Sequence, residues 1–161
     1  MLTKSNRVKA RELVLELMEG RQPDIAIQLP YLPPAQPNAG YQGSNLNVIR
    51  AKIRQIKAQC RKDVTARLLE AGWVDGTPPF QQAVVLVTFW LPTRGRRDHD
   101  NLVAAMKPIF DALHPDEDHP DGVLVDDNLG VIGIPFYDYD VRPGLTRTII
   151  EIWDTSPERL L

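Results

Sequence analysis

Two aspartates, Asp98 and Asp100, stand two residues apart shortly after the most apolar run of the chain, Ala83 to Leu91. In an extended segment at the end of a strand, alternate side chains point the same way, so both carboxylates can face one point. Proteins typically hold Mg²⁺ with one or two carboxylates, while water and substrate phosphates complete the coordination shell. This spacing is therefore compatible with a magnesium site that handles phosphates.

A second acidic pair, Asp126 and Asp127, follows the short apolar run Val123 to Val125. This pair could add one or two ligands from a neighbouring element. Three or four converging carboxylates repel one another unless a cation or protons lie between them. Such a cluster is typical of two-metal phosphodiester hydrolysis, in which one ion activates water and the other stabilises the leaving oxygen.

Simpler interpretations of these residues stay open. Asp100 or Asn101 could cap the helix that follows, and the neighbouring arginines could neutralise Asp98. In an extended chain His99 points away from its flanking aspartates, which places it at the surface or facing a phosphate. The acidic segment after residue 113 contains His114 and further carboxylates. It could bind a metal by itself, but its composition favours a solvated loop.

The basic residues are segregated from the acidic ones. The net charge is only −2, yet residues 50–67 are strongly basic, and residues 111–127 are acidic with no lysine or arginine. A long helix is predicted over residues 45–70, because apolar residues recur every three or four positions: Leu46, Ile49, Ile53, Ile56, Cys60, Val64 and Leu68. A basic row lies about 100° around this helix from the apolar stripe: Arg50, Arg54, Lys57 and Arg61. The row is either a solvated face or a track for a phosphate backbone.

The composition is typical of a soluble globular protein of 161 residues, with 43% hydrophobic and 25% charged residues. No run approaches the roughly 20 apolar residues that a membrane span needs, so we expect no membrane partner. The single cysteine, Cys60, excludes an internal disulfide and fits a reducing compartment. We expect a cytoplasmic protein.

The remaining elements must position these residues. Helices and strands alternate irregularly with one hairpin-like return, which predicts an α+β (mixed α/β) fold with a small mixed β-sheet and packed helices in a single domain. Pro108 should kink or split the helix expected over 101–113. The other predicted elements are a helix over 4–19 and strands over Ile25–Leu29, Gln82–Leu91, Val123–Val125, Val131–Tyr137 and Leu145–Trp153.

The order of these motifs resembles the RusA family of Holliday junction resolvases, which are often phage-derived. The family pattern is an Arg-rich D-x-D-N-L that opens a helix, a lysine and D-A-L on that helix, and an apolar D-D before a strand. This chain carries "RRDHDNL", "KPIFDAL" and "GVLVDDNLGV" in that order. Further back, "IAIQLPYLPPAQPN" is similar to the family's first strand and its continuation. The likeness implies a RusA-like domain over residues 23–155, preceded by a helical extension over 1–22 and followed by a tail over 156–161.

The resemblance assigns roles residue by residue. Asp98, Asp100 and Asp127 match the family's essential aspartates and metal ligands, with Asp126 as a neighbouring candidate. Lys107 matches the catalytic lysine when the alignment runs backward from "FDAL", whereas counting forward from Asp100 gives Ala104. The two alignments differ by a three-residue insertion, "VAA". Three residues are close to one helical turn, so Lys107 can lie on the same face of the helix as the family lysine. The residues expected to contact the DNA backbone are Arg94, Arg96, Arg97, Arg50, Arg54, Lys57 and Arg61.

By this resemblance the protein is a Mg²⁺-dependent endonuclease, with Mn²⁺ as a possible substitute, that cuts four-way DNA junctions as a homodimer. A twofold protein matches a junction that needs two symmetric cuts. Three alternatives stay open. They are a nuclease for forks, flaps or duplex, a non-catalytic relative that binds branched DNA, and a small protein that buffers metal with its acidic loop.

Overall fold

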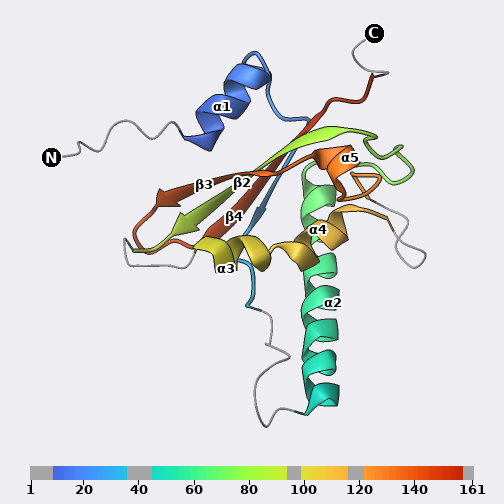
Figure 1. Ribbon diagram of the computed structural model, residues 1–161. Helices are drawn as coiled ribbons and strands as arrows, with labels where there is room; N and C mark the ends of the chain where they lie inside the picture. Colours follow the sequence, from blue (N-terminus) through green and yellow to red (C-terminus); the bar gives the residue numbers. More distant parts are fainter. Residues whose placement is uncertain (1–8, 36–44, 94–98, 116–121, 158–161) are drawn as a thin grey trace, which may run out of the picture.

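The computed structural model describes residues 9–35, 45–93, 99–115 and 122–157, with the side chain of His99 left out (Figure 1). Within these ranges the elements follow the chain as α1 (Ala10–Leu17), β1 (Ile25–Leu29), α2 (Leu46–Glu70), β2 (Ala83–Leu91), α3 (His99–Ala104), α4 (Lys107–Leu113), α5 (Leu129–Ile132), β3 (Phe136–Val141) and β4 (Arg147–Asp154). None of the helices in these ranges is both long and apolar enough to cross a lipid bilayer.

The four strands form one mixed sheet in the order β1-β4-β2-β3. β4 runs antiparallel to both of its neighbours, with Ile150 opposite Ile27 on β1 and opposite Val87 on β2. β3 runs parallel to β2, with Phe136 opposite Leu86. The predicted α+β class and mixed sheet are thereby confirmed. The expected hairpin-like return is wrong for the described strands, because β2 separates β3 from β4.

The parallel pairing of β2 and β3 determines where the chemistry-bearing residues go. Parallel neighbours require a crossover connection, because the chain must return to the end of the sheet where the first strand began before it can start the second. Residues 92–135 make this crossover and include α3, α4 and α5. The crossover therefore carries Asp100, Lys107 and Asp127 together, on segments that lie outside the sheet.

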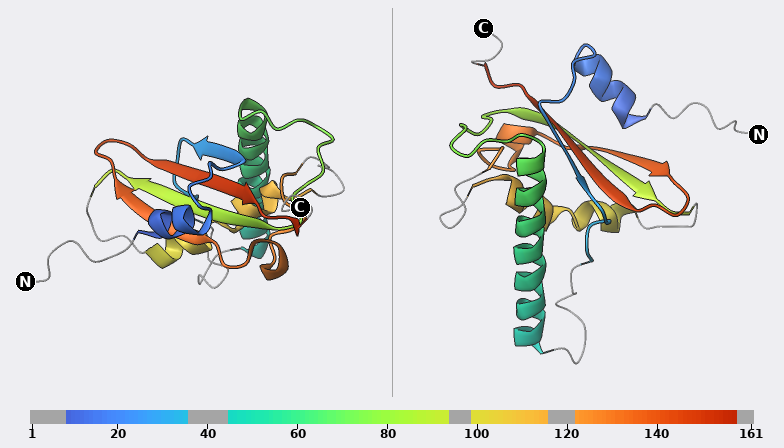
Figure 2. Two further views of the ribbon diagram at one scale, coloured as in Figure 1. Left: turned by 90° about the horizontal axis from the view of Figure 1, so that it is seen from above. Right: turned by 180° about the vertical axis from the view of Figure 1, so that it is seen from behind.

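The two faces of the sheet are covered unequally. Figures 1 and 2 show α1 on one face and α2, α3 and α4 on the other. Side chains alternate along each strand, so Ile150 and Ile152 of β4 enter the large core beneath α2 and α4, while Trp153 packs against Val14 of α1. The Trp153 indole N–H also donates to the backbone carbonyl of Arg21, at 2.8 Å. The N-terminal helix, which lies outside the RusA resemblance, thus closes the second face.

The long helix α2 is packed along only part of its length. Asn45 caps it by accepting a hydrogen bond from the backbone N–H of Asn47, at 2.9 Å. Its buried residues toward the C-terminus include Cys60, Val64 and Leu68, which belong to the main core. The N-terminal half projects beyond the sheet (Figure 1), and Leu46, predicted to lie on the apolar stripe, is 54% exposed.

The helix expected over 101–113 is split, as Pro108 predicted. α3 ends at Ala104 and α4 begins at Lys107, so Pro108 lies in the first turn of the new helix. Proline lacks the N–H that an interior helical position donates, and its ring clashes with the carbonyl four residues earlier. The first turn is the place in a helix where neither property matters. The residues between the helices, Ala105 and Met106, are buried.

Two strand predictions were wrong in detail. The segment expected as a strand from Val131 begins instead with the short helix α5, because the Asn128 side chain accepts hydrogen bonds from the N–H groups of Gly130 and Val131. The helix ends at Gly133, whose φ of 60° suits glycine. The strand expected over Val123–Val125 is reduced to one parallel bridge between Leu124 and Phe80.

Candidate active site

Lys107 and Asp127, twenty positions apart, meet on the outside of α4. The Lys107 ammonium lies 2.9 Å from Oδ2 of Asp127 and 2.8 Å from Oδ1 of Asp111, which is one turn further along α4. Lys107 therefore bridges two carboxylates that come from different segments. Its side chain is 62% exposed, whereas those of Asp111 and Asp127 are 27% and 16% exposed. The cluster is open to a ligand from solvent.

Asp127 reaches this position because the preceding residues are pinned to the end of α4. The N–H groups of Val123 and Leu124 both donate to the carbonyl of Leu113, at 2.9 and 3.1 Å. A Cβ at Gly122 would lie only 2.5 Å from the backbone nitrogen of Pro115, so a glycine is required for this approach. The two ends of the acidic loop are thereby held together at its base, and the length of the loop does not keep Asp127 away from Lys107.

His114 adds a nitrogen ligand to the same place. Its Nδ1 lies 3.2 Å from the carbonyl oxygen of Pro115, which can accept a hydrogen bond from the tautomer that carries its hydrogen on Nδ1. Nε2 then faces Asp111, 3.8 Å from its Oδ1. Metal-ligating histidines commonly donate their second ring N–H to a carbonyl in this way. Asp111, His114 and Asp127 can each offer one ligand atom, and these three atoms all lie within 4.8 Å of one another.

The donor set fits a divalent cation. Two carboxylates suit the oxygen preference of Mg²⁺, and an added imidazole also suits Mn²⁺ and other transition metals. The Lys107 ammonium lies between the two carboxylates and neutralises part of their charge. Its hydrogen bonds to Asp111 and then Asp127 raise the pKa of Lys107 well above its usual value. A metal held by both carboxylates would therefore compete with this ammonium.

Asp126 and Asp127 are adjacent but do different things. Oδ1 of Asp126 accepts the N–H of Asp127 at 2.7 Å, and its Oδ2 accepts the Asn128 side-chain amide at 2.8 Å. These two donors, the backbone N–H first, lower the pKa of Asp126. Both oxygens thus serve the turn that leads into α5. The structure places Asp126, the less certain of the predicted ligands, outside the group formed around Lys107.

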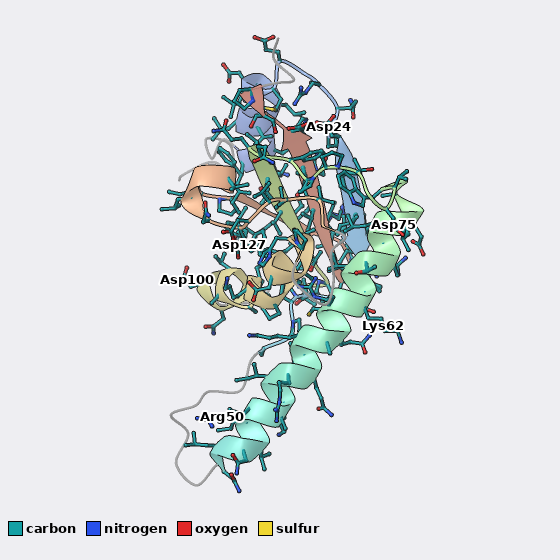
Figure 3. All side chains as sticks on the ribbon, turned by 90° about the vertical axis from the view of Figure 1, so that its right-hand side faces the viewer. Asp24, Arg50, Lys62, Asp75, Asp100 and Asp127 are labelled. Atoms are coloured by element: carbon teal, nitrogen blue, oxygen red, sulfur yellow. The ribbon has the colours of Figure 1, made fainter. Side chains whose placement is uncertain are left out.

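Asp100 lies on the same side of the molecule but outside the group of ligand atoms formed by Asp111, His114 and Asp127. It is exposed in the first turn of α3, one helical turn before Ala104. Ala104 lines the same surface hollow as Lys107 and Asp127, and Figure 3 shows Asp100 and Asp127 facing one side, away from Asp75. Asp98 and the predicted DNA-contacting residues Arg94, Arg96 and Arg97 lie outside the described residues.

The basic row of α2 divides into two parts. Arg50, Arg54 and Lys57 are exposed, and none of them forms a salt bridge within the part of the chain that the structure describes. Arg61 instead holds the end of α4, because its guanidinium donates to the carbonyls of Asp111 at 2.8 Å and His114 at 3.5 Å. Arg61, predicted to contact DNA, has a structural partner.

A surface groove of about 760 Å³ lies along the contact between α2 and α4. Lys57, Arg61 and Lys62 line one wall, and Asp111 and His114 line the other. Lys62 and Arg50, labelled in Figure 3, mark two points along the outer surface of α2. The exposed basic residues of α2 therefore lead along the helix to the edge of the carboxylate cluster.

Sequence reasoning missed Asp111 and His114 as parts of the site. Asp111 enters the sequence analysis only as an acidic residue and as part of the D-A-L match, and the composition favours a solvated loop for His114. A signal was present, because Lys107, Asp111 and His114 are spaced by four and three, which places them on one face of a helix. The structure brings all three to Asp127.

A scan of the chain against protein-family models found no match, and a search of curated proteins found no significant match. The RusA resemblance therefore stays a prediction drawn from its motifs.

Proposed function

We propose that this protein is a metal-dependent endonuclease that cuts branched DNA, four-way junctions above all. The observation that carries the proposal is the contact of Lys107 with Asp127 and Asp111 beside a groove lined by basic residues. Carboxylates that can hold a divalent cation support metal-assisted phosphodiester hydrolysis, and a lysine and nearby basic residues suit a polyanionic substrate. The RusA-like order of the motifs supports the same function.

The metal would be held by Asp127 with Asp111 and His114, whose ligand atoms lie within 4.8 Å of one another, and the RusA resemblance adds Asp98 and Asp100 as further donors. Mg²⁺ or Mn²⁺ bound there supplies Lewis-acid activation of water and stabilises charge on the phosphate. Asp126 contributes indirectly, because its carboxylate holds the N–H of Asp127 and so fixes the turn that presents Asp127.

Lys107 acts as a fixed positive charge in this proposal. Its hydrogen bonds to Asp111 and Asp127 raise the pKa of Lys107 and so favour the protonated, positively charged amine. The ammonium is exposed and sits on a flexible stem, which lets it turn from Asp127 toward the scissile phosphate. There it would stabilise the negative charge that develops during cleavage.

The exposed row of Arg50, Arg54 and Lys57 would hold the DNA backbone. Contacts to phosphate fix position without reading bases, which suits an enzyme that selects structure rather than sequence. Two symmetric cuts require two active sites, so we propose that the protein works as a homodimer.

The test is cleavage of an end-labelled four-way junction beside a linear duplex of the same sequence. The reactions contain Mg²⁺, Mn²⁺ or EDTA, and the variants are Asp100→Asn and Asp75→Asn. Asp75 is an exposed aspartate remote from Asp127, so its variant controls for the loss of one surface charge. We expect paired symmetric nicks in the junction alone, abolished by EDTA and by Asp100→Asn and unchanged in Asp75→Asn.

The other outcomes separate the alternatives. Cutting of forks, flaps or duplex as fast as junctions would identify a nuclease with a different substrate. Tight junction binding with no cleavage in either metal would identify a non-catalytic DNA-binding relative. Metal binding without affinity for DNA would contradict the nuclease function and leave a metal-buffering protein.

A further inference from the structure

A second hollow involves other residues of α4 than the α2–α4 groove, because Lys107 and Phe110 line it whereas Pro108, Asp111 and Ala112 line the groove. It has a volume of about 800 Å³, and both Lys107 and Asp127 form part of its wall. Most of the rest is apolar and comes from α3, α4, α5 and the start of β3, including Phe110, Leu129, Ile134 and Tyr137. The wall of the hollow thus combines the contacting pair Lys107 and Asp127 with a largely apolar surface.

Two large apolar side chains at the rim are unusually exposed. Leu129 is 75% exposed and Ile134 is 80% exposed, the two highest values among the large hydrophobic residues described. The local structure holds them there, since Asn128 caps the start of α5 and Gly133 turns the chain at its end. Folding gains nothing from this exposure, because apolar surface is stabilising only when it leaves water.

We propose that this hollow receives an unpaired nucleobase of the DNA strand, the base next to the scissile phosphate. This inference rests on the proposed nuclease function and deepens it. In a nucleotide, an anionic phosphate and a flat, weakly polar ring are joined by one sugar. The hollow offers both kinds of surface, since Lys107 and Asp127 lie in contact in its wall and most of its other lining residues are aromatic or aliphatic. Any base can occupy such a surface, because every base has a π-face.

The proposal gives a physical source for structure selectivity. A base in continuous duplex must be unstacked and unpaired before it can enter the hollow, which costs free energy, whereas a base at a branch point is already easier to displace. Leu129 and Ile134 stand where they would contact the displaced base or fill the gap in the stack, as apolar wedges do in other DNA complexes. A second copy of this chain is the other occupant that such a surface could attract.

The test uses four-way junctions with 2-aminopurine at successive positions around the mapped cut, in Ca²⁺ so that binding is measured without cleavage. The full chain is compared with Leu129→Ser, Ile134→Ser and the control Leu17→Ser, an exposed leucine on α1. Fluorescence reports unstacking, anisotropy reports affinity, and sedimentation reports the oligomeric state. Because all three side chains are exposed, thermal unfolding should be unchanged.

We expect the wild-type protein to raise the fluorescence of one or two adjacent 2-aminopurines at the cut. Ile134→Ser and Leu129→Ser should remove most of this rise and weaken junction binding by about tenfold, leaving duplex binding and sedimentation unchanged. Wild-type binding with no fluorescence change would overturn the base pocket but leave the nuclease function intact. A shift to monomers in both variants, with the fluorescence rise kept, would show that the surface joins two copies. No binding of junctions by the wild type would overturn both proposals.

Discussion

Two cations at α4, Lys107 of α4 itself and Arg61 of the neighbouring α2, have different roles. Lys107 contacts the carboxylates of Asp111 and Asp127 and remains mostly exposed. Arg61 donates to the carbonyls of Asp111 and His114 and is only partly exposed. Lys107 is paired with side chains that can move and exchange partners, whereas Arg61 is paired with backbone that cannot move without unwinding α4. Both residues carry one positive charge, so it is their hydrogen-bond partners that make Lys107 the better candidate for a role in chemistry.

Asp127→Asn should have the largest effect on activity. The amide removes a negative charge and one metal-binding oxygen from the Lys107 cluster, so cleavage should fall by more than about 100-fold. Asp126→Asn is the matched control, since its carboxylate serves the turn rather than the cluster. Initial rates of junction cleavage under single-turnover conditions measure both. Equal losses in the two variants would mean that the turn, rather than the Asp127 carboxylate, limits the reaction.

Lys107→Met should lower the cleavage rate by about 100-fold, because it removes a charge that stabilises the transition state. The free energy of unfolding should change by less than about 1 kcal/mol, as is usual for an exposed ion pair. With the ammonium gone, Asp111 and Asp127 should bind Mn²⁺ more tightly, which titration calorimetry can measure. Lys107→Arg keeps the charge and should retain part of the activity. Full activity in Lys107→Met would exclude Lys107 from the chemistry.

Gly122→Ala should affect both stability and cleavage. Its methyl group would overlap the backbone at Pro115, at a cost of about 1–3 kcal/mol, and would push Asp127 away from α4. Gly76→Ala is the comparison, because Gly76 has a positive φ of 82° with open space around it. That variant should lose stability alone. Urea unfolding and cleavage assays on both proteins separate the effects, and normal cleavage in Gly122→Ala would contradict the role of the pinned segment.

Arg61→Ala should cost about 1–2 kcal/mol of unfolding free energy, because the last carbonyls of α4 lose a charged donor. Lys62→Ala, an exposed neighbour, should cost almost nothing. Chemical denaturation followed by circular dichroism measures both. If Arg61→Ala were fully stable and instead weakened DNA binding, Lys107 and Arg61 would share one role.

Arg54→Ala should have the smallest effect and should act on DNA binding alone. The logarithm of the DNA affinity falls linearly with the logarithm of the salt concentration, and losing one phosphate contact should make this slope less steep by about 0.9. Lys52→Ala is the control, since Lys52 lies on α2 but outside the basic row. Fluorescence anisotropy with junction DNA at several salt concentrations gives the slopes. Identical slopes in wild type and Arg54→Ala would assign the row to a solvated face.

The strongly patterned elements could be predicted from the sequence alone. β1 has the bounds that its apolar residues and Pro30 indicated, and α2 begins within one residue of the expected position. These elements form because one of their faces is buried in the core, and the apolar residues of that face recur in the sequence with the period of a helix or a strand. α5 could not be found this way, because one capping side chain and one glycine define its four residues.

The candidate site was predictable from the sequence only in part. The sequence placed Lys107 and Asp127 in one site, and the structure brings them into contact. The resemblance preferred Asp127 to Asp126, but residue types alone could not show the turn that gives the two carboxylates different partners. Nor could composition show that His114 and Gly122, at the two ends of an acidic segment, are packed together at the end of α4.

The close packing at Gly122 also has a practical use. Pro115 and Gly122 are in close contact at the end of α4, and the residues that follow Gly122 are hydrogen-bonded to the carbonyl of Leu113. A peptide tag or a cysteine for a fluorophore, introduced in the sequence between Pro115 and Gly122, should therefore leave the contact between Lys107 and Asp127 in place. Such a label stands only a few positions in the sequence from His114 and Asp127, so its signal would test whether metal or DNA arrives at these candidate donors.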